Sequence, residues 1–184
     1  DIDGETAYDY SGGSVNLSAD GSVVAIGAPG NDGNEENSGH VRVYKNVNDT
    51  WTKIGEDIDG EFALDESGYS ISLSSDGSVV AIGAPYNDEN GNRSGHLRIF
   101  KNVNDTWTQV GSDIDGENSE DHFGYIVSIS GDGSVVAVGS PYSSDSDTQY
   151  QGYVRIYQNI DGNWTKLKND IEAEAEGDSA SSLS

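Results

Sequence analysis

The sequence predicts an all-β protein, and within that class a β-propeller, whose antiparallel sheets (blades) are arranged around an axis. Two observations lead to this prediction. The same order of motifs recurs about every 56 residues along the 184-residue chain, and each copy contains four short segments with strand-like patterns. Four antiparallel strands in every repeat of about 50 residues are typical of a propeller blade.

Three motifs align the copies. The motif Asp-Ile-Asp-Gly-Glu begins at Asp1, Asp57 and Asp113. The motif Ser-x-Asp-Gly-Ser-Val-Val-Ala begins at Ser18, Ser74 and Ser130, and a Trp-Thr pair closes the copies at Trp51, Trp107 and Trp164. We therefore divide the chain into repeats at residues 1–56, 57–112 and 113–169, with 170–184 as the truncated start of a fourth, all within one propeller domain.

The second repeat shows the four strands clearly. Residues 70–74 alternate polar and apolar side chains, as a half-buried strand does. The Asp-Gly pair at 76–77 predicts a two-residue hairpin turn with positive φ at both positions. Residues 79–82 form a continuous apolar run, which is expected of a strand covered on both faces. Residues 96–100 alternate again, and residues 107–110 form the last strand after an Asn-Asp turn.

A two-sheet sandwich is the alternative architecture, but it explains the strands without explaining their repetition. Because three blades cannot close a ring, we expect the chain to be a segment of a propeller with about 6–8 blades. The expected structural partners are then the remaining blades of the same chain or neighbouring subunits.

The repeat resembles a known family. Ser67-Gly68 or Phe123-Gly124, followed by a strand, an Asp-Gly turn and Ile-Gly-Ala-Pro ending at Pro85, is similar to the FG-GAP repeat of integrin α-subunit propellers. The closer resemblance is to the short variety with a Leu-Ser-x-Asp-Gly turn and a terminal tryptophan, found in large microbial and algal surface proteins. The resemblance covers essentially the whole chain. It implies the propeller fold and a place at the cell surface. It does not specify an activity, because propellers host many activities.

Composition narrows the classes of partner. Lys and Arg total 9 against 33 Asp and Glu, for a net charge of −24. Such a chain repels nucleic acid and anionic membranes, so we expect neither nucleic acid binding nor membrane insertion. Cysteine is absent, which excludes disulfides, thiolate metal sites and a cysteine nucleophile.

Calcium is the metal to consider first. In the family that the chain resembles, an Asp-x-Asp-x-Asp-Gly loop between the first two strands holds the ion. Here each such hairpin offers one carboxylate, whereas Ca²⁺ takes 6–8 oxygen ligands, so the family's metal residues do not carry over. Carboxylates also alternate in the motif that opens each repeat, and these are our candidates for weak Ca²⁺ binding: Asp57, Asp59, Glu61, Asp113, Asp115 and Glu117. A solvated acidic connection is the alternative, and no cofactor is required.

Catalytic residues do not stand out in the sequence. His40 and His96 hold equivalent positions, occupied by Tyr153 in the third repeat, and we expect them on the strand surface. His122 lies beside acidic residues in a variable loop. We therefore predict that the chain is not an enzyme. A cluster of His, Arg and Tyr at the mouth of the axial channel would favour an enzyme instead.

Other recurrent residues are predicted to be structural or to carry glycans. One arginine and one tryptophan per repeat are expected to form ion pairs and to pack, respectively: Arg42, Arg98, Arg155, Trp51, Trp107 and Trp164. Asn-x-Ser/Thr sequons in suitable turns and loops make these residues glycosylation candidates: Asn48, Asn92, Asn104 and Asn163.

These observations predict an extracellular or cell-surface module for adhesion or for protein or glycan interaction. The ligand is expected on the face that carries the loops with Asp32, Asp88 and Asp145. One alternative is an architectural repeat in a cell-wall or appendage assembly. Another is a propeller lyase or hydrolase with an axial-channel site.

Overall fold

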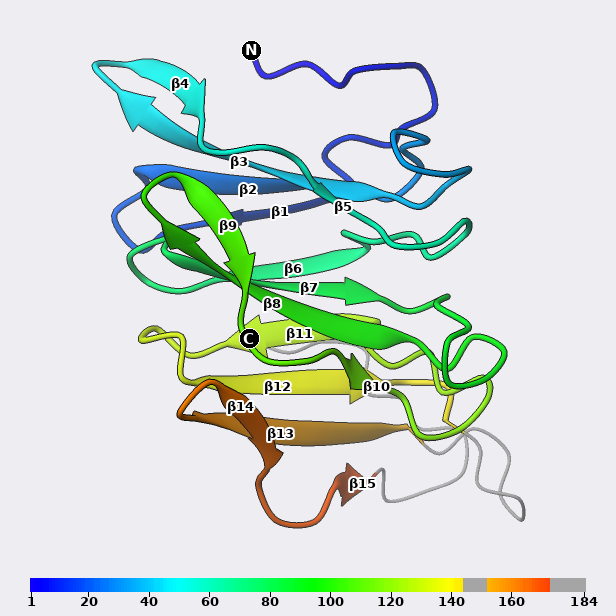
Figure 1. The fold of residues 1–184 in the computed structure, drawn as a ribbon. Coiled ribbons are helices and arrows are strands. Elements are labelled where there is room, and N and C mark those ends of the chain that lie inside the picture. Colours follow the sequence, from blue (N-terminus) through cyan, green and yellow to red (C-terminus); the bar gives the residue numbers. More distant parts are fainter. Residues whose placement is uncertain (144–151, 173–184) are drawn as a thin grey trace.

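The computed structural model describes residues 1–143 and 152–172, and within them it contains only β-strands and loops (Figure 1). Three antiparallel sheets follow one another along the chain and stack face to face. The all-β prediction is therefore confirmed. Within the described residues no helix is long and apolar enough to cross a membrane. The predicted start of a fourth repeat lies mostly in 173–184, outside the described residues.

Each sheet is built from the four predicted strands, paired in chain order. The first sheet contains β1 (Ser14–Leu17), β2 (Val23–Ala28), β3 (His40–Val47) and β4 (Thr50–Lys53). The second contains β6 (Ser70–Leu73), β7 (Val79–Ala84), β8 (His96–Val103) and β9 (Thr106–Gln109). The third contains β11 (Ile126–Ile129), β12 (Val135–Ser140), β13 (Tyr153–Ile160) and β14 (Asn163–Lys166).

A short fifth strand, absent from the prediction, completes each sheet. β5 (Ile58–Asp59), β10 (Ile114–Asp115) and β15 (Ile171–Glu172) pair with β3, β8 and β13 respectively. The reason is a difference in length. β8 has eight residues, but β9 has four and pairs only with its second half. The first half keeps a free edge, and β10 satisfies its backbone groups there.

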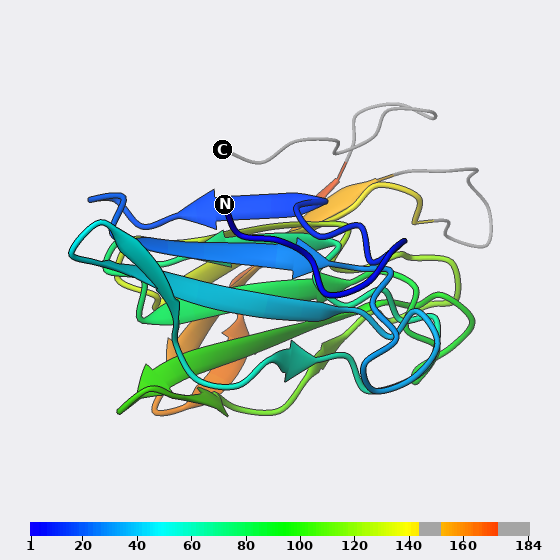
Figure 2. The same cartoon turned by 90° about the horizontal axis from the view of Figure 1, so that it is seen from above.

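The sheets meet most closely at their innermost strands, β1, β6 and β11, which contact one another in that order (Figure 2). Small residues allow this approach. The Ser70 hydroxyl donates to the Gly124 carbonyl at 2.7 Å. A Cβ added to Gly83 would lie 2.0 Å from that same oxygen. Glycine at this position therefore lets one sheet sit against the next.

Apolar side chains fill the two spaces between the sheets. One cluster joins the first and second sheets and includes Val41, Ile71 and Ile82. The other joins the second and third sheets and includes Leu97, Phe123 and Val138. All six residues of β7 are buried, which confirms the prediction that its continuous apolar run is covered on both faces.

The hairpin turns differ in one respect from the prediction. Around Asp76 only Gly77 has a positive φ, and its N–H donates to the Ser74 carbonyl at 2.9 Å. The turn before β7 is therefore wider than the two-residue form predicted. Two successive positive φ values occur instead in the turn between β8 and β9, at Asn104 and Asp105. The asparagine and aspartate tolerate that conformation at modest cost.

Candidate functional site: a repeated polar network and an aromatic cluster

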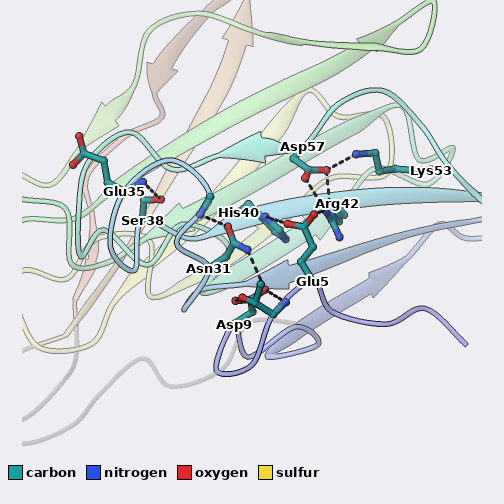
Figure 3. A network of polar contacts seen from close by, with 11 residues as sticks. Glu5, Asp9, Asn31, Glu35, Ser38, His40, Arg42, Lys53 and Asp57 are labelled. Atoms are coloured by element: carbon teal, nitrogen blue, oxygen red, sulfur yellow. Dashed lines mark hydrogen bonds and ion pairs between the residues drawn. The ribbon is translucent and has the colours of Figure 1, made fainter.

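The first sheet carries a network of ion pairs at the predicted acidic motif (Figure 3). Arg42 donates from Nε and Nη2 to the two oxygens of Asp57, at 3.0 and 2.9 Å. Lys53 Nζ donates to Asp57 at 2.7 Å, and Glu5 pairs with Arg42. The ion pairs with Arg42 and Lys53 outweigh the effect of burial and hold the Asp57 pKa below its ordinary value. Two cations thus already occupy the space between these carboxylates.

The third sheet repeats the arrangement. Arg155 donates to both oxygens of Asp170, each at 2.8 Å, and Lys166 Nζ lies 3.0 Å from the same carboxylate. Glu117 pairs with Arg155 at 2.9 Å. The hydrogen bond from Arg155 lowers the Asp170 pKa. Bidentate pairing of this kind fixes both side chains.

The second sheet departs from this pattern. Gln109 replaces the lysine and donates from Nε2 to Asp113. Arg98 forms no ion pair with Asp113 among the described residues; it donates from Nη2 to the Asp59 carbonyl at 2.7 Å and lies 3.6 Å from Glu61. Glu89 adds a third carboxylate where the first repeat has glycine. The acidic groups of this sheet are therefore short of positive charge.

The six predicted calcium candidates do not form one site. Asp57 and Glu117 are ion-paired in different sheets, and Asp59 is exposed. Glu61 and Asp113 come together, joined by Glu89 and His96, with ligand atoms within 4.8 Å of one another. Asp115 lies directly across from His96 in the ladder and has a buried oxygen without a hydrogen-bond partner among the described residues.

The histidine prediction was wrong. His40 and His96 are 2% and 0% exposed, not on the surface. The short fifth strands explain this, because they cover the halves of β3 and β8 in which the two histidines lie. Burial lowers the pKa of His96 to about 4, so its imidazole is neutral at pH 7. Neither nitrogen of His96 has a hydrogen-bond partner in the described part of the chain.

An aromatic cluster lies at the inner end of the loop face. Tyr86 is the second residue after β7 and Tyr69 directly precedes β6, so both lie where the loops leave the sheet. Ring centroids are 4.8 to 5.9 Å apart in a connected group that contains Tyr69, Tyr86, His122, Tyr125 and Tyr142. Arg93 lies over the Tyr86 ring at 5.8 Å. We refer to these six residues as the aromatic cluster.

Sequence reasoning missed three buried carboxylates in the connections between repeats: Asp9, Asp65 and Asp121. Asp65 accepts from the Asn87 side chain and the Phe62 N–H, each at 3.1 Å. Burial raises the Asp65 pKa. The signal available in the sequence was recurrence. Each of these carboxylates stands at the same position of its repeat, and so does the asparagine or serine that pairs with it. Their hydrogen bonds tie the connections to the loops beside them.

The predicted ligand-face residues Asp32 and Asp88 are exposed and close their own loops, since each accepts a backbone N–H at 2.7 Å. Asp145 lies outside the described residues. Trp107 and Trp164 each donate to a backbone carbonyl of the preceding sheet's final segment, at 2.9 and 2.8 Å. Trp51 lies on an exposed stretch of β4. The four sequon asparagines are all exposed, and their glycosylation stays a prediction.

Comparison with solved structures identifies the fold. A protein from Bacteroides fragilis assigned as a 6-phosphogluconolactonase aligns with a TM-score of 0.53 at 19% identity. The alignment covers 86% of this chain and 38% of that protein. Saccharomyces cerevisiae Sqt1 aligns with a TM-score of 0.58 at 14% identity, and the alignment covers 94% of this chain and 38% of Sqt1. A protein from Bacteroides uniformis with the same assignment aligns with a TM-score of 0.55 at 17% identity, and the alignment covers 85% of this chain and 39% of that protein. The chain thus spans less than half the length of these structures.

These neighbours correct the prediction that the chain is not an enzyme. Two of them carry the name of a hydrolytic enzyme. The aromatic cluster is also the kind of His, Arg and Tyr grouping that favours an enzyme. At this low identity the likeness establishes the fold and leaves the reaction open.

The sequence comparison gives the family. No curated protein matches the chain. The FG-GAP repeat matches residues 59–100 and 112–157, which contain β6, β7, β11 and β12 and the first parts of β8 and β13. The chain therefore carries FG-GAP repeats, and its sheets are blades of a β-propeller.

Proposed function

We propose that the chain is part of an extracellular or cell-surface propeller whose loop face binds a protein or glycan ligand. The observation that carries the proposal is the aromatic cluster. Its side chains come from two consecutive blades and lie at the loop-face end of the inner strands. Propeller ligands bind at such loop faces because a rigid scaffold positions the side chains.

The chemistry of the cluster suits a carbohydrate. Tyrosine presents a flat apolar face to the C–H groups of a sugar and a hydroxyl to its polar groups. Burial raises the pKa of Tyr69 and of Tyr86, so both phenols stay protonated and donate hydrogen bonds at neutral pH. Glu66 and Glu120 flank the cluster in the adjoining connections, and carboxylates accept hydrogen bonds from sugar hydroxyls.

An extracellular place is supported by the exposed turns that carry sequons, at Asn48 and Asn104 among others. A protein ligand and an architectural role remain the alternatives to glycan binding. An architectural repeat requires no ligand on the loop face, so the binding experiment below separates an architectural role from ligand binding.

The test is binding of the 184-residue chain to a glycan array, followed by calorimetry on the strongest ligand. Tyr69→Ala and Tyr125→Ala each remove a ring from the cluster, and we expect affinity to fall about tenfold or more, since truncating an aromatic side chain at the centre of a binding site costs about 2 kcal/mol or more. Tyr8→Ala is the matched control, because Tyr8 is 84% exposed and has no ring partner among the described residues. Equal affinity in all three variants contradicts the proposal.

A hydrolase is the second candidate, favoured by one observation. His122 Nε2 lies 3.5 Å from the Glu120 carboxylate, and the imidazole contacts the Tyr86 and Tyr142 rings at 5.2 and 5.4 Å. A carboxylate beside a histidine makes a general base. Turnover of a lactone or glycoside by the chain, lost in His122→Gln while ligand binding persists, would establish this candidate over simple binding.

A further inference from the structure

The second blade differs from the other two in a way that ion pairing does not explain. In the first blade Arg42 and Lys53 both pair with Asp57, and in the third blade Arg155 and Lys166 both pair with Asp170. In the second blade an uncharged glutamine, Gln109, stands in place of the lysine. Three carboxylates, Glu61, Glu89 and Asp113, then come together, and Arg98, 3.6 Å from Glu61, is the one cation that pairs with any of them within the described residues.

A buried imidazole points into this group. His96 is 0% exposed and neither of its ring nitrogens has a hydrogen-bond partner in the described residues. One of those nitrogens lies within 4.8 Å of an oxygen of each of the three carboxylates. A buried polar group without a partner is costly, and its presence calls for a ligand that satisfies it.

We propose that Glu61, Glu89, His96 and Asp113 bind one divalent transition-metal ion of the zinc or manganese class. Three carboxylates balanced by Arg98 leave two negative charges, which a divalent ion neutralises. The imidazole favours zinc, which binds nitrogen and oxygen ligands alike, and the three carboxylates also suit Mn²⁺, whereas Ca²⁺ and Mg²⁺ are bound by oxygen ligands.

The strands place the ligands suitably. His96 and Arg98 are two residues apart on β8, and Asp113, which directly precedes β10, is two residues from Asp115, so each pair shares one face of the sheet. Ligand atoms bound at about 2.0–2.2 Å around one tetrahedral zinc ion lie roughly 3.3–3.6 Å apart. The half-buried Glu61 and Asp113 and the exposed Glu89, whose ligand atoms lie within 4.8 Å of one another, therefore need to move closer by roughly 1.5 Å at most. Glu89 also gives the ion a path from solvent.

The first blade serves as the internal comparison. Glu5, His40 and Asp57 form an equivalent group, but Arg42 and Lys53 already neutralise its carboxylates. Gly33 also stands where the second blade has Glu89. The proposed site shares no residue with the aromatic cluster, so it neither requires nor supports the proposed binding function.

The experiment titrates the metal-stripped 184-residue chain with Zn²⁺ and with Mn²⁺, and uses Ca²⁺ as the control for class. We expect native mass spectrometry to find one zinc per chain, and thermal melting to show Tm raised by about 5–10 °C at a hundredfold excess over Kd. Pulsed electron paramagnetic resonance of bound Mn²⁺ is expected to show coupling to an imidazole nitrogen. Equal stabilisation by Ca²⁺, or absence of that coupling, would overturn the assignment of His96.

The variants use the protein's own repeats. Gln109→Lys restores the residue of the first and third blades, so the fold persists while its ammonium group takes the place of the metal; we expect zinc binding to be lost. Glu89→Gln and Asp113→Asn should each raise Kd at least tenfold. Glu36→Gln, which removes an exposed carboxylate outside the site, is the matched control and should change nothing. Retention of one zinc by Gln109→Lys, or failure of the parent chain to bind zinc, contradicts the proposal.

Discussion

Single carboxylates have different roles at different positions of the repeat, although their side chains are alike. Asp57 and Asp170 close ion-pair networks, while Asp65 is buried among neutral donors. A third group closes the turn between the first two strands of each sheet: Asp20, Asp76 and Asp132. Asp132 accepts from the hydroxyls of Ser130 and Ser134 at 2.6 and 2.7 Å and from a backbone N–H at 3.0 Å. These bonds stabilise the ionised form.

This turn gives a prediction about acid stability. The hydroxyl of Ser130, then that of Ser134, lowers the Asp132 pKa to about 2. Because the folded pKa lies below the unfolded value of about 4, the stabilisation is present above pH 4 and is lost as pH falls from about 4 to about 2. Asp132→Asn should therefore lose less stability over that range than the parent chain does.

Urea unfolding at pH 6 and pH 2.5 measures the effect. Asp161→Asn is the control, since the Asp161 carboxylate accepts no hydrogen bond within residues 1–143 and 152–172. If Asp132→Asn and the parent chain lose stability equally on acidification, the turn carboxylate does not contribute as described.

At the scale of the element, the inner strand and its neighbour are fitted to the next blade. Gly83 on β7 lies against the backbone at Gly124, and Ser70 on β6 donates to the same carbonyl. The first pair of blades repeats the contact, with Gly27 against Gly68. The glycine of the Ile-Gly-Ala-Pro motif is therefore required for close packing between neighbouring sheets.

Gly83→Ala tests that requirement. The new Cβ would lie 2.0 Å from a backbone oxygen that cannot move without shifting the next blade. We expect a loss of about 1–3 kcal/mol in unfolding free energy, as for overpacked cores, measured by urea denaturation. Gly131→Ala provides the comparison, because its Cβ would meet the Ser75 hydroxyl, which can rotate away. Similar losses in both variants would contradict the close-packing explanation.

At the scale of the molecule, the middle blade is covered on both faces, whereas the first blade is covered on one face by the described residues. Val15 and Leu17 of β1 are 56% and 55% exposed, whereas Ile71 and Leu73 at the equivalent positions of β6 are 8% and 6% exposed. Exposed apolar strands of this kind are interaction surfaces. We interpret these faces as contacts for further blades, from the same chain or from neighbouring subunits.

The corresponding prediction concerns association. The 184-residue chain alone should self-associate with rising concentration in sedimentation velocity, because burying the two β1 side chains gains about 1.5–3 kcal/mol each. Val15→Asp combined with Leu17→Lys should shift the population toward the monomer. A parent chain that stays monomeric and stable to heating at all concentrations would show that these faces need no partner.

The sequence by itself determined the repeat, the four main strands and the continuous apolar run of β7, because alternation, turn residues and self-similarity are local properties of the chain. It also grouped the arginines with acidic neighbours. It did not predict the fifth strands, since their two residues carry no pattern. Those strands bury His40 and His96, and folding brings Glu61, Glu89 and Asp113 close to His96. Only the tertiary structure decided this, because proximity across blades depends on which strand edges remain free after the hairpins have paired.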